Sequence, residues 1–262
     1  LYDEVATGAR LSLTRALWSD FVSGNVSYTI ENVGITRVDA AASPELKAET
    51  GTRLVSKVGT GIVYDARKGG LVPTGGQRLE FLTEVAGGPL GGESDFYKFE
   101  FRGSQYLPGF WEGQNWEIIG RMGSIAGYNG DHPTLFNRYF LGGPRTLRGF
   151  RYAHVSPTDS LNEPFGGNTY WLGSVEYNIP IIERLRFALF YDIGNVYSSS
   201  FSINPNTSRG ERLFQDDVGA GFRINIPNLG PLRLDYGIPL NVDSHQRHSG
   251  HFNFDVGFTR DF

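Results

Sequence analysis

The sequence feature that most constrains the fold is a period of two in the hydrophobicity of the C-terminal third. In the segment 250–262, hydrophobic side chains alternate with polar residues and glycine. The segments 232–240 and 216–226 show the same alternation, and 185–194 and 171–179 continue it. Because successive side chains of a β-strand point to opposite faces, each segment predicts a strand with one apolar and one polar face.

Less regular strands are predicted upstream, so that the chain holds about eleven strands in all. Their approximate ranges are 5–17, 25–38, 51–65, 76–86, 94–107 and 115–127. The composition agrees, because 35 Gly, 19 Phe and 13 Tyr favour strands and tight turns over helices. The sequence therefore predicts an all-β fold.

The connections between these strands alternate between short and mostly longer ones, and the longer ones cover 39–50, 128–167, 197–214 and 241–250. Outer-membrane barrels have short turns on the periplasmic side and long loops outside. The four tryptophans lie at or near strand ends, where an interfacial aromatic belt places them: Trp18, Trp111, Trp116 and Trp171. These features predict an antiparallel transmembrane β-barrel.

A soluble β-sandwich is the alternative, since its strands alternate as well. The predicted strands are about ten residues or longer, which suits a tilted bilayer crossing better than a sandwich. Their polar faces also carry charges deep within strands, as a wet lumen allows: Arg102, Glu176, Arg186, Asp192, Arg223 and Asp235. Arg15 and Arg260 fall on the apolar face, where an arginine costs about 2 to 4 kcal/mol at the bilayer midplane, but both lie near strand ends.

Composition and charge exclude several function classes. A net charge of −4 at pH 7 argues against a nucleic-acid partner, which would require a basic surface. The sequence has no apolar run of the length that a membrane-spanning helix needs. The absence of cysteine excludes disulfides and thiolate metal sites. The first ten residues have neither a basic nor an apolar leader segment, so any signal peptide is expected to have been removed or to lie upstream.

Two motifs lie in and after the longest connection. Residues 147–150 read Leu-Arg-Gly-Phe, and residues 190–194, two strands later, read Phe-Tyr-Asp-Ile-Gly. They resemble the (V/L)-R-G-(F/Y) loop motif and the F-x-D-x-G strand motif of the BamA-like outer-membrane insertase superfamily, which includes TamA, two-partner secretion transporters and organellar import pores. The turn 64–78 and the aromatic strand ending at Phe262 are also similar to that family.

The resemblance implies the C-terminal part of a barrel of about sixteen strands, with a long extracellular loop that folds inward. Five strands follow the motif loop, as in that family. Residues 1–262 are therefore expected to form a single barrel domain that lacks the family's POTRA repeats and first strands. A shorter natural or engineered barrel is the alternative. The terminal strand departs from the family pattern at Arg260, where an outward hydrophobic or aromatic residue is expected.

The loop arginine Arg148 needs anionic partners if the connection 128–167 folds into the lumen, because a desolvated guanidinium is tolerated only when it is paired. Strand parity points Glu176 and Asp192 inward, and the resemblance implies the same two partners. The loop motif Leu147, Arg148, Gly149 and Phe150, the strand motif Phe190, Asp192 and Gly194, and Glu176 are thus the candidate lock. A solvated surface arginine is the alternative.

The sequence contains few patterns that indicate a ligand-binding, metal-binding or catalytic site. The stretch 142–149 lacks the G-K-[ST] end of a phosphate-binding loop. His245, His248 and His251 are spaced by three, but they lie in a connection, where a solvated loop is the simpler interpretation than a metal site. No G-x-S-x-G elbow occurs and every histidine falls in a connection, so no enzyme, cofactor or metal is expected.

The resemblance implies an outer-membrane assembly factor of a Gram-negative-type bacterium, with membrane lipids, unfolded β-barrel clients and accessory lipoproteins as partners. The C-terminal strand would form one side of a lateral seam, with the residues Phe252, Phe254, Val256, Gly257, Phe258 and Phe262. A two-partner secretion or TamA-like translocation pore is the alternative within the family. A passive porin is the alternative from another class.

Overall fold

Eleven antiparallel strands form one sheet in chain order in the computed structural model, which describes residues 2–69, 73–226, 230–244, 246 and 248–256. Each strand pairs only with its sequence neighbours within the described residues. The strands are β1 Asp3–Ala16, β2 Val22–Thr36, β3 Gly51–Asp65, β4 Gly76–Ala86, β5 Phe96–Pro108, β6 Asn115–Gly127, β7 Thr169–Ile182, β8 Leu185–Tyr197, β9 Gln215–Ile226, β10 Gly230–Asn241 and β11 His251–Val256. The prediction of an all-β fold with eleven strands is confirmed.

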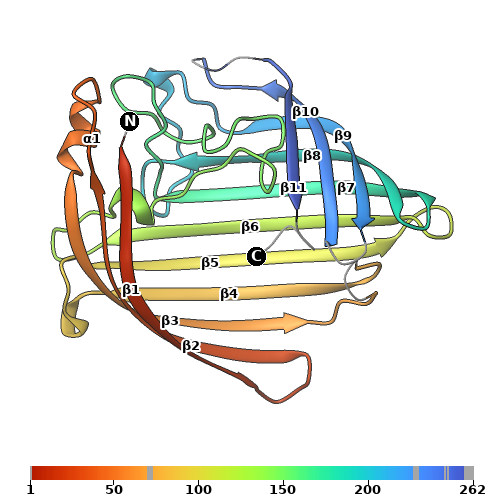
Figure 1. The fold of residues 1–262 in the computed structure, drawn as a ribbon, viewed down its shortest axis with the longest axis horizontal. Coiled ribbons are helices and arrows are strands. Elements are labelled where there is room, and N and C mark those ends of the chain that lie inside the picture. The colour runs from red at the N-terminus through yellow and green to blue at the C-terminus, as the bar shows by residue number, and fades with distance from the viewer. Residues whose placement is uncertain (1, 70–72, 227–229, 245, 247, 257–262) are drawn as a thin grey trace.

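The sheet curves around a lumen and remains open (Figure 1). Its edge strands, β1 and β11, each have a single strand neighbour among the described residues. Most strands have 11 to 15 residues, which is long enough for a tilted bilayer crossing. Most predicted boundaries agree within about three residues, the typical uncertainty of such predictions.

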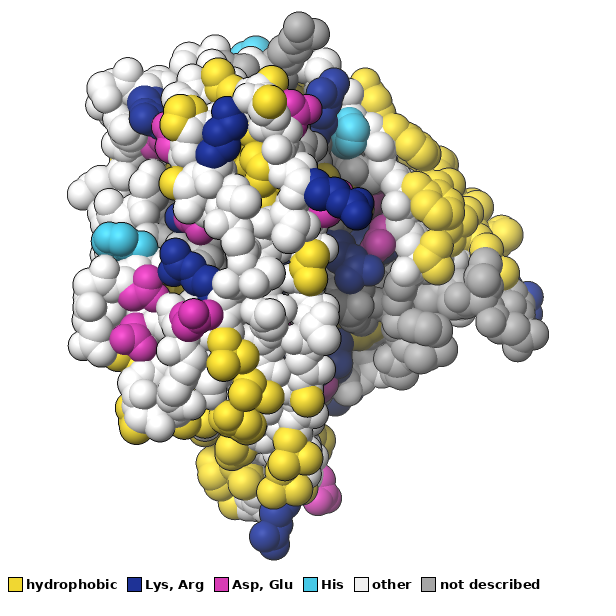
Figure 2. Space-filling view, turned by 60° about the vertical axis from the view of Figure 1, so that its left-hand side comes forward, with side chains coloured by type: hydrophobic (Ala, Val, Ile, Leu, Met, Phe, Trp, Pro, Cys, Tyr) yellow, Lys and Arg dark blue, Asp and Glu magenta, His cyan; other side chains and the backbone are white. Residues whose placement is uncertain are grey.

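The two faces of the sheet differ in polarity. The outer face exposes large hydrophobic side chains on every strand, among them Leu11, Ile62, Phe101, Met122 and Phe252. In Figure 2 such side chains gather along the flanks of the molecule, whereas many charged side chains lie on the end formed by the long connections. An apolar outer face around a polar interior is the arrangement of a transmembrane barrel. Arg15 is exposed one residue before the end of β1, and Arg260 lies outside the described residues.

The connections at one end of the sheet are mostly short, and those at the other end are mostly longer. The longer connections carry the helix α1 Pro44–Ala48 and the 3-10 turns Gly88–Leu90, Leu135–Asn137 and Thr207–Arg209. Ser43 begins α1 because its Oγ accepts a hydrogen bond from the Leu46 amide at 3.1 Å. Within the described residues, no helix is long and apolar enough to cross a membrane.

The hydrophobic core lies inside the lumen rather than between two sheets. Residues of the connection 128–168 pack against the inner ends of the strands to form a buried cluster that includes Leu147, Phe150, Val155, Phe96 and Val196. A sandwich would bury its apolar faces between sheets. The connection therefore folds inward and fills one end of the barrel, so the soluble sandwich is excluded.

Candidate functional site

The inward connection places the Leu-Arg-Gly-Phe motif in a tight turn. Gly142 and Gly143 have φ angles of 103° and 101°, which an L side chain rarely adopts. The Gly143 amide then donates hydrogen bonds to the carbonyls of Leu147 and Phe150, both at 3.1 Å. Leu147 and Phe150 are buried in the lumenal core. The turn thus leaves Arg148 directed at the barrel wall.

Arg148 is fully buried and is held by the carboxylates of two wall strands. Its Nε and Nη2 donate to Asp192 Oδ2 at 2.7 Å and Oδ1 at 2.9 Å, a bidentate arrangement. Its Nη1 donates to Glu176 Oε2 at 2.5 Å. Ser174 orients Asp192 through a hydroxyl hydrogen bond of 2.5 Å. The structure therefore brings the loop arginine to both carboxylates that parity pointed inward.

Three further charged residues complete the network, and the sequence reasoning did not assign them to it. Arg223 donates to Glu176 at 3.0 and 2.6 Å and to Asp235 Oδ1 at 2.6 Å. Arg233 Nη2 donates to Glu176 Oε2 at 3.2 Å. Three guanidinium groups thus face the carboxylates of Glu176, Asp192 and Asp235, with Arg148 Nη1 3.8 Å from Asp235. Their charges balance, as burial requires.

The strand motif residues support Arg148 from one side. The guanidinium lies over the ring of Phe190 at 3.5 Å from its centroid, a cation–π contact. Gly194 makes room for the neighbouring strand β7, because a Cβ there would lie 2.5 Å from the Trp171 carbonyl oxygen, and the loop residue Leu141 packs over the same position at 3.4 Å. Phe190, Asp192 and Gly194 therefore provide the ring, the anion and the space.

The loop backbone also approaches β9, β10 and β11 closely. A Cβ on Gly149 would lie 2.5 Å from Asp217 Cβ, and one on Gly237 would lie 2.6 Å from the Gly149 nitrogen. Asn253 Nδ2 donates to the Arg148 carbonyl oxygen at 2.6 Å. On the lumenal side, Arg148 and its neighbours thus contact every strand from β7 to the edge strand β11.

The seam residues lie partly within the described chain. Phe252, Phe254 and Val256 point outward from β11 and are exposed, whereas Gly257, Phe258 and Phe262 lie outside the described residues. Residues 251–256 pair with β10 along the register from His251–Gly237 to Val256–Leu232. The other edge of β11 faces no described strand.

A second set of contacts holds the beginning of the same connection. Arg138 donates to Glu49 at 2.5 Å and lies over the Phe165 ring, 4.4 Å from its centroid. Burial lowers the pKa of Arg138 from its ordinary value, and the Glu49 carboxylate opposes that shift. Lys98 of β5 lies 4.5 Å from the centroid of the Tyr139 ring. The connection is thus attached at both sides of the lumen.

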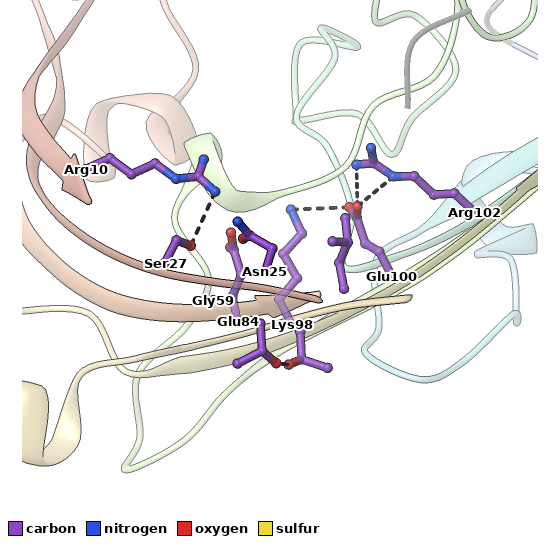
Figure 3. Close-up of a pocket in the computed structure, with 11 residues that line it drawn as sticks. Arg10, Asn25, Ser27, Gly59, Glu84, Lys98, Glu100 and Arg102 are labelled. Atoms are coloured by element: carbon purple, nitrogen blue, oxygen red, sulfur yellow. Dashed lines mark hydrogen bonds and ion pairs between the residues drawn. The ribbon is translucent and has the colours of Figure 1, made fainter. Parts of the chain in front are cut away.

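A polar cavity of about 240 Å³ lies on the lumenal side of β1 to β5. Figure 3 shows its charged residues, among them Arg10, Lys98, Glu100 and Arg102. Glu100 accepts from Arg102 at 2.5 Å, and Lys98 is 3.5 Å away. Glu100 is thus paired with two neighbouring cations, as expected for charged side chains that line a water-filled lumen.

No group of three or more metal-binding side chains occurs in the part of the chain that the structure describes. His248 lies in the connection before β11, and His245 lies outside the described residues. His251 was predicted to lie in the same connection, but it is the first residue of β11 and pairs with Gly237 of β10. What the Arg148 network provides is a buried, neutral set of charge-assisted hydrogen bonds that holds a loop inside a barrel.

Comparison with protein families matches residues 1–259 to the Omp85 superfamily domain. A "sorting and assembly machinery component 50 homolog A" of Xenopus laevis is 27% identical over 259 residues, covering 91% of this chain and 53% of that protein. The outer membrane protein assembly factor BamA of Neorickettsia risticii is 27% identical over 240 residues, covering 90% of this chain and 31% of that protein. The chain thus spans about half or less of the length of these relatives.

Solved structures share the fold. BamA of Haemophilus ducreyi lacking POTRA domains 1–3 superposes with a TM-score of 0.82 at 17% identity, covering 98% of this chain and 54% of that one. CdiB of Acinetobacter baumannii gives a TM-score of 0.61 at 14% identity, covering 97% and 42%. The second likeness is the weaker of the two.

Proposed function

Because this chain belongs to the Omp85 superfamily, we propose that it forms the barrel wall of an outer-membrane assembly factor that folds and inserts other β-barrel proteins. The observation that supports this most is the buried Arg148 network, which ties an inward loop to the wall beside an edge strand with no described partner on one side. The similarity to BamA and to component 50 of the sorting and assembly machinery supports the same function.

The proposed mechanism is β-augmentation at the edge of the barrel. An edge strand presents unpaired N–H and C=O groups, to which an extended client strand can add. The Asn253 side chain ties β11 to the Arg148 carbonyl, so the loop holds the inner face of that strand while its edge stays available. The free energy comes from folding of the client, and the proposal assigns no catalytic step and no cofactor.

The proposed location is the outer membrane of a Gram-negative-type bacterium. The partners are its lipids, unfolded β-barrel clients and accessory assembly lipoproteins. Relatives among both bacterial and animal proteins make a mitochondrial barrel the second possibility. The likeness to CdiB keeps a translocation pore as the second candidate function.

The test is client folding by the full-length protein reconstituted in phospholipid vesicles. We expect faster folding of an added outer-membrane β-barrel, measured by its heat-modifiable mobility in gels, than in protein-free vesicles. Arg148→Ala should slow the client, whereas Arg151→Ala, a change at an exposed arginine of the same connection, should not. Client release across the membrane without insertion would point to a pore, and ion conductance without either effect would point to a porin.

A further inference from the structure

The connection after β8 passes over the outside of the barrel wall. Residues 198–201, called the rim strap below, lie against the start of β7 and the end of β6. Thr169 Oγ1 donates to the Ser199 carbonyl oxygen at 2.8 Å. Ser200 Oγ donates to the Ile125 carbonyl oxygen at 2.6 Å. Hydrogen bonds between the strap and two wall strands therefore fix its path.

The hydroxyl groups beneath the strap belong to the outer face of the sheet. Ser124 follows the exposed Met122 by two residues on β6, so its side chain points to the same outer face. It bonds to Thr169 at 2.9 Å and accepts the Phe201 amide at 2.8 Å. Both hydroxyl residues are buried although they point outward. The strap thus covers polar groups that would otherwise face lipid, where an unsatisfied hydroxyl is costly.

Phe201 brings its ring back onto this outer face. The ring stacks on Tyr97 with centroids 5.9 Å apart and lies 6.3 Å from Phe99. Its backbone has a φ of 52°, a left-handed conformation that disfavours a bulky residue. The side chain nevertheless remains 57% exposed. Strain of this kind at a residue with an exposed ring suggests that the ring has a use outside the molecule.

The position of the ring along the barrel fits a bilayer interface. At the opposite end of the strands, an aromatic cluster lies at the short turns. The ring centroids of Trp116 and Tyr177 are 4.4 Å apart, and those of Phe110 and Trp116 are 6.0 Å apart. Tyr97 lies on the same strand as Leu107, which pairs with Trp116. The ten residue steps from Tyr97 to Leu107 span about 33 Å, and a strand tilt of about 40° reduces this to about 25 Å across the membrane. That is the height of the apolar band of an outer-membrane barrel.

We propose that Phe201, together with Tyr97 and Phe99, is an anchoring site for the lipid bilayer at the boundary between acyl chains and headgroups. Tyr97 and Phe99 belong to the apolar outer face of β5, whereas Phe201 is supplied by a connection rather than by a strand. It complements the aromatic cluster at the short turns, so that both membrane interfaces are marked on the same wall. The proposal does not depend on the client-folding function.

A nitroxide label at position 201 tests the site, since these 262 residues have no cysteine. The full-length protein, with any cysteine elsewhere replaced by serine, would carry Phe201→Cys in phosphatidylcholine vesicles. We expect collisions with dissolved oxygen to exceed those with a water-soluble nickel complex. The control Ser208→Cys, at an exposed position of the same connection, should show the reverse. A label at 201 that behaves like the one at 208, or that is shielded from both reagents by protein, overturns the proposal.

Phe201→Trp provides a second test that keeps an aromatic ring at the site. Relative to the unchanged protein, the added tryptophan emission should be lost in vesicles of phospholipids brominated near the headgroup. Added emission that these lipids leave unquenched would likewise overturn the assignment of the site to the bilayer. A heat-modifiable gel band establishes in both experiments that the barrel is folded.

Discussion

Gly237→Ala adds one methyl group where β10 touches the motif loop, without altering any charged residue. The new Cβ would lie 2.6 Å from the Gly149 nitrogen and 2.8 Å from the Arg148 carbonyl carbon, whereas ordinary contact begins near 3.4 Å. The loop would therefore have to retreat by about 0.8 Å, the difference between the two distances. Both obstructing atoms are backbone, so no side-chain rotation can relieve the contact.

The expected cost is about 1 to 3 kcal/mol of unfolding free energy, as for other overpacked sites. Gly120→Ala on β6 is the matched control, because a Cβ there meets nothing within 4 Å. A strand glycine replaced by alanine without a clash should gain up to about 0.5 kcal/mol. The two variants should thus move in opposite directions.

Urea unfolding in phospholipid vesicles, followed by tryptophan fluorescence, measures both changes. Trypsin provides a local reading, because Arg145 and Arg151 flank the motif and are accessible. The Gly237→Ala protein should be cut faster between β6 and β7 than the control. Equal stability and equal cleavage of the two variants would refute the claim that the loop lies tightly against β10.

Four further substitutions, at three positions, probe the same network. Arg148→Ala should cost about 3 kcal/mol, the lower end for breaking a buried ion pair, because Glu176 keeps Arg223 and Arg233; Arg148→Lys should recover less than half of it, since lysine cannot bond Asp192 in a bidentate manner. Asn253→Ala should cost about 1 kcal/mol and speed proteolysis of the loop. Phe190→Leu should cost about 1 to 2 kcal/mol through the lost cation–π contact. Urea titration checks each value, and wild-type midpoints would contradict them.

The strands were predictable because alternation is a local property of the sequence. The apolar positions of 216–226 and 232–240 identify the outer face of β9 and β10 without knowledge of their neighbours. The same parity placed Glu176 and Asp192 in the lumen. Their meeting with Arg148 also required the path of a long connection, which the family resemblance supplied and periodicity could not.

The wider network was not predicted, because it depends on which lumenal residues meet across strands. Arg223 of β9 reaches Glu176 of β7 over the intervening strand β8. A signal was present in the inward-facing glycines of β9: a Cβ on Gly219 would lie 2.3 Å from the Phe190 ring, and one on Gly221 would lie 2.0 Å from Asp235 Oδ1. Inward glycines in a barrel strand indicate that large side chains of neighbouring strands occupy their space.

The rim strap was also beyond the sequence reasoning. The connection 197–214 was recognised only as a long loop, and nothing local in it specifies a return over the outer face. Its path depends on outward hydroxyl groups of Ser124 and Thr169, which lie on other strands. Long-range contacts of this kind produce no hydrophobic periodicity in the loop sequence from which they could be predicted.

The central claim is that Arg148 holds the loop to the wall through Asp192, and a double-mutant cycle tests it most directly. Unfolding free energies in vesicles would be measured for Arg148→Ala, Asp192→Ala and the double variant, with Arg151→Ala in place of Arg148→Ala as the control cycle. We expect the Arg148 cycle to give a coupling of about 2 kcal/mol or more, and the control cycle to be additive within about 0.5 kcal/mol. An additive Arg148 cycle would contradict the account.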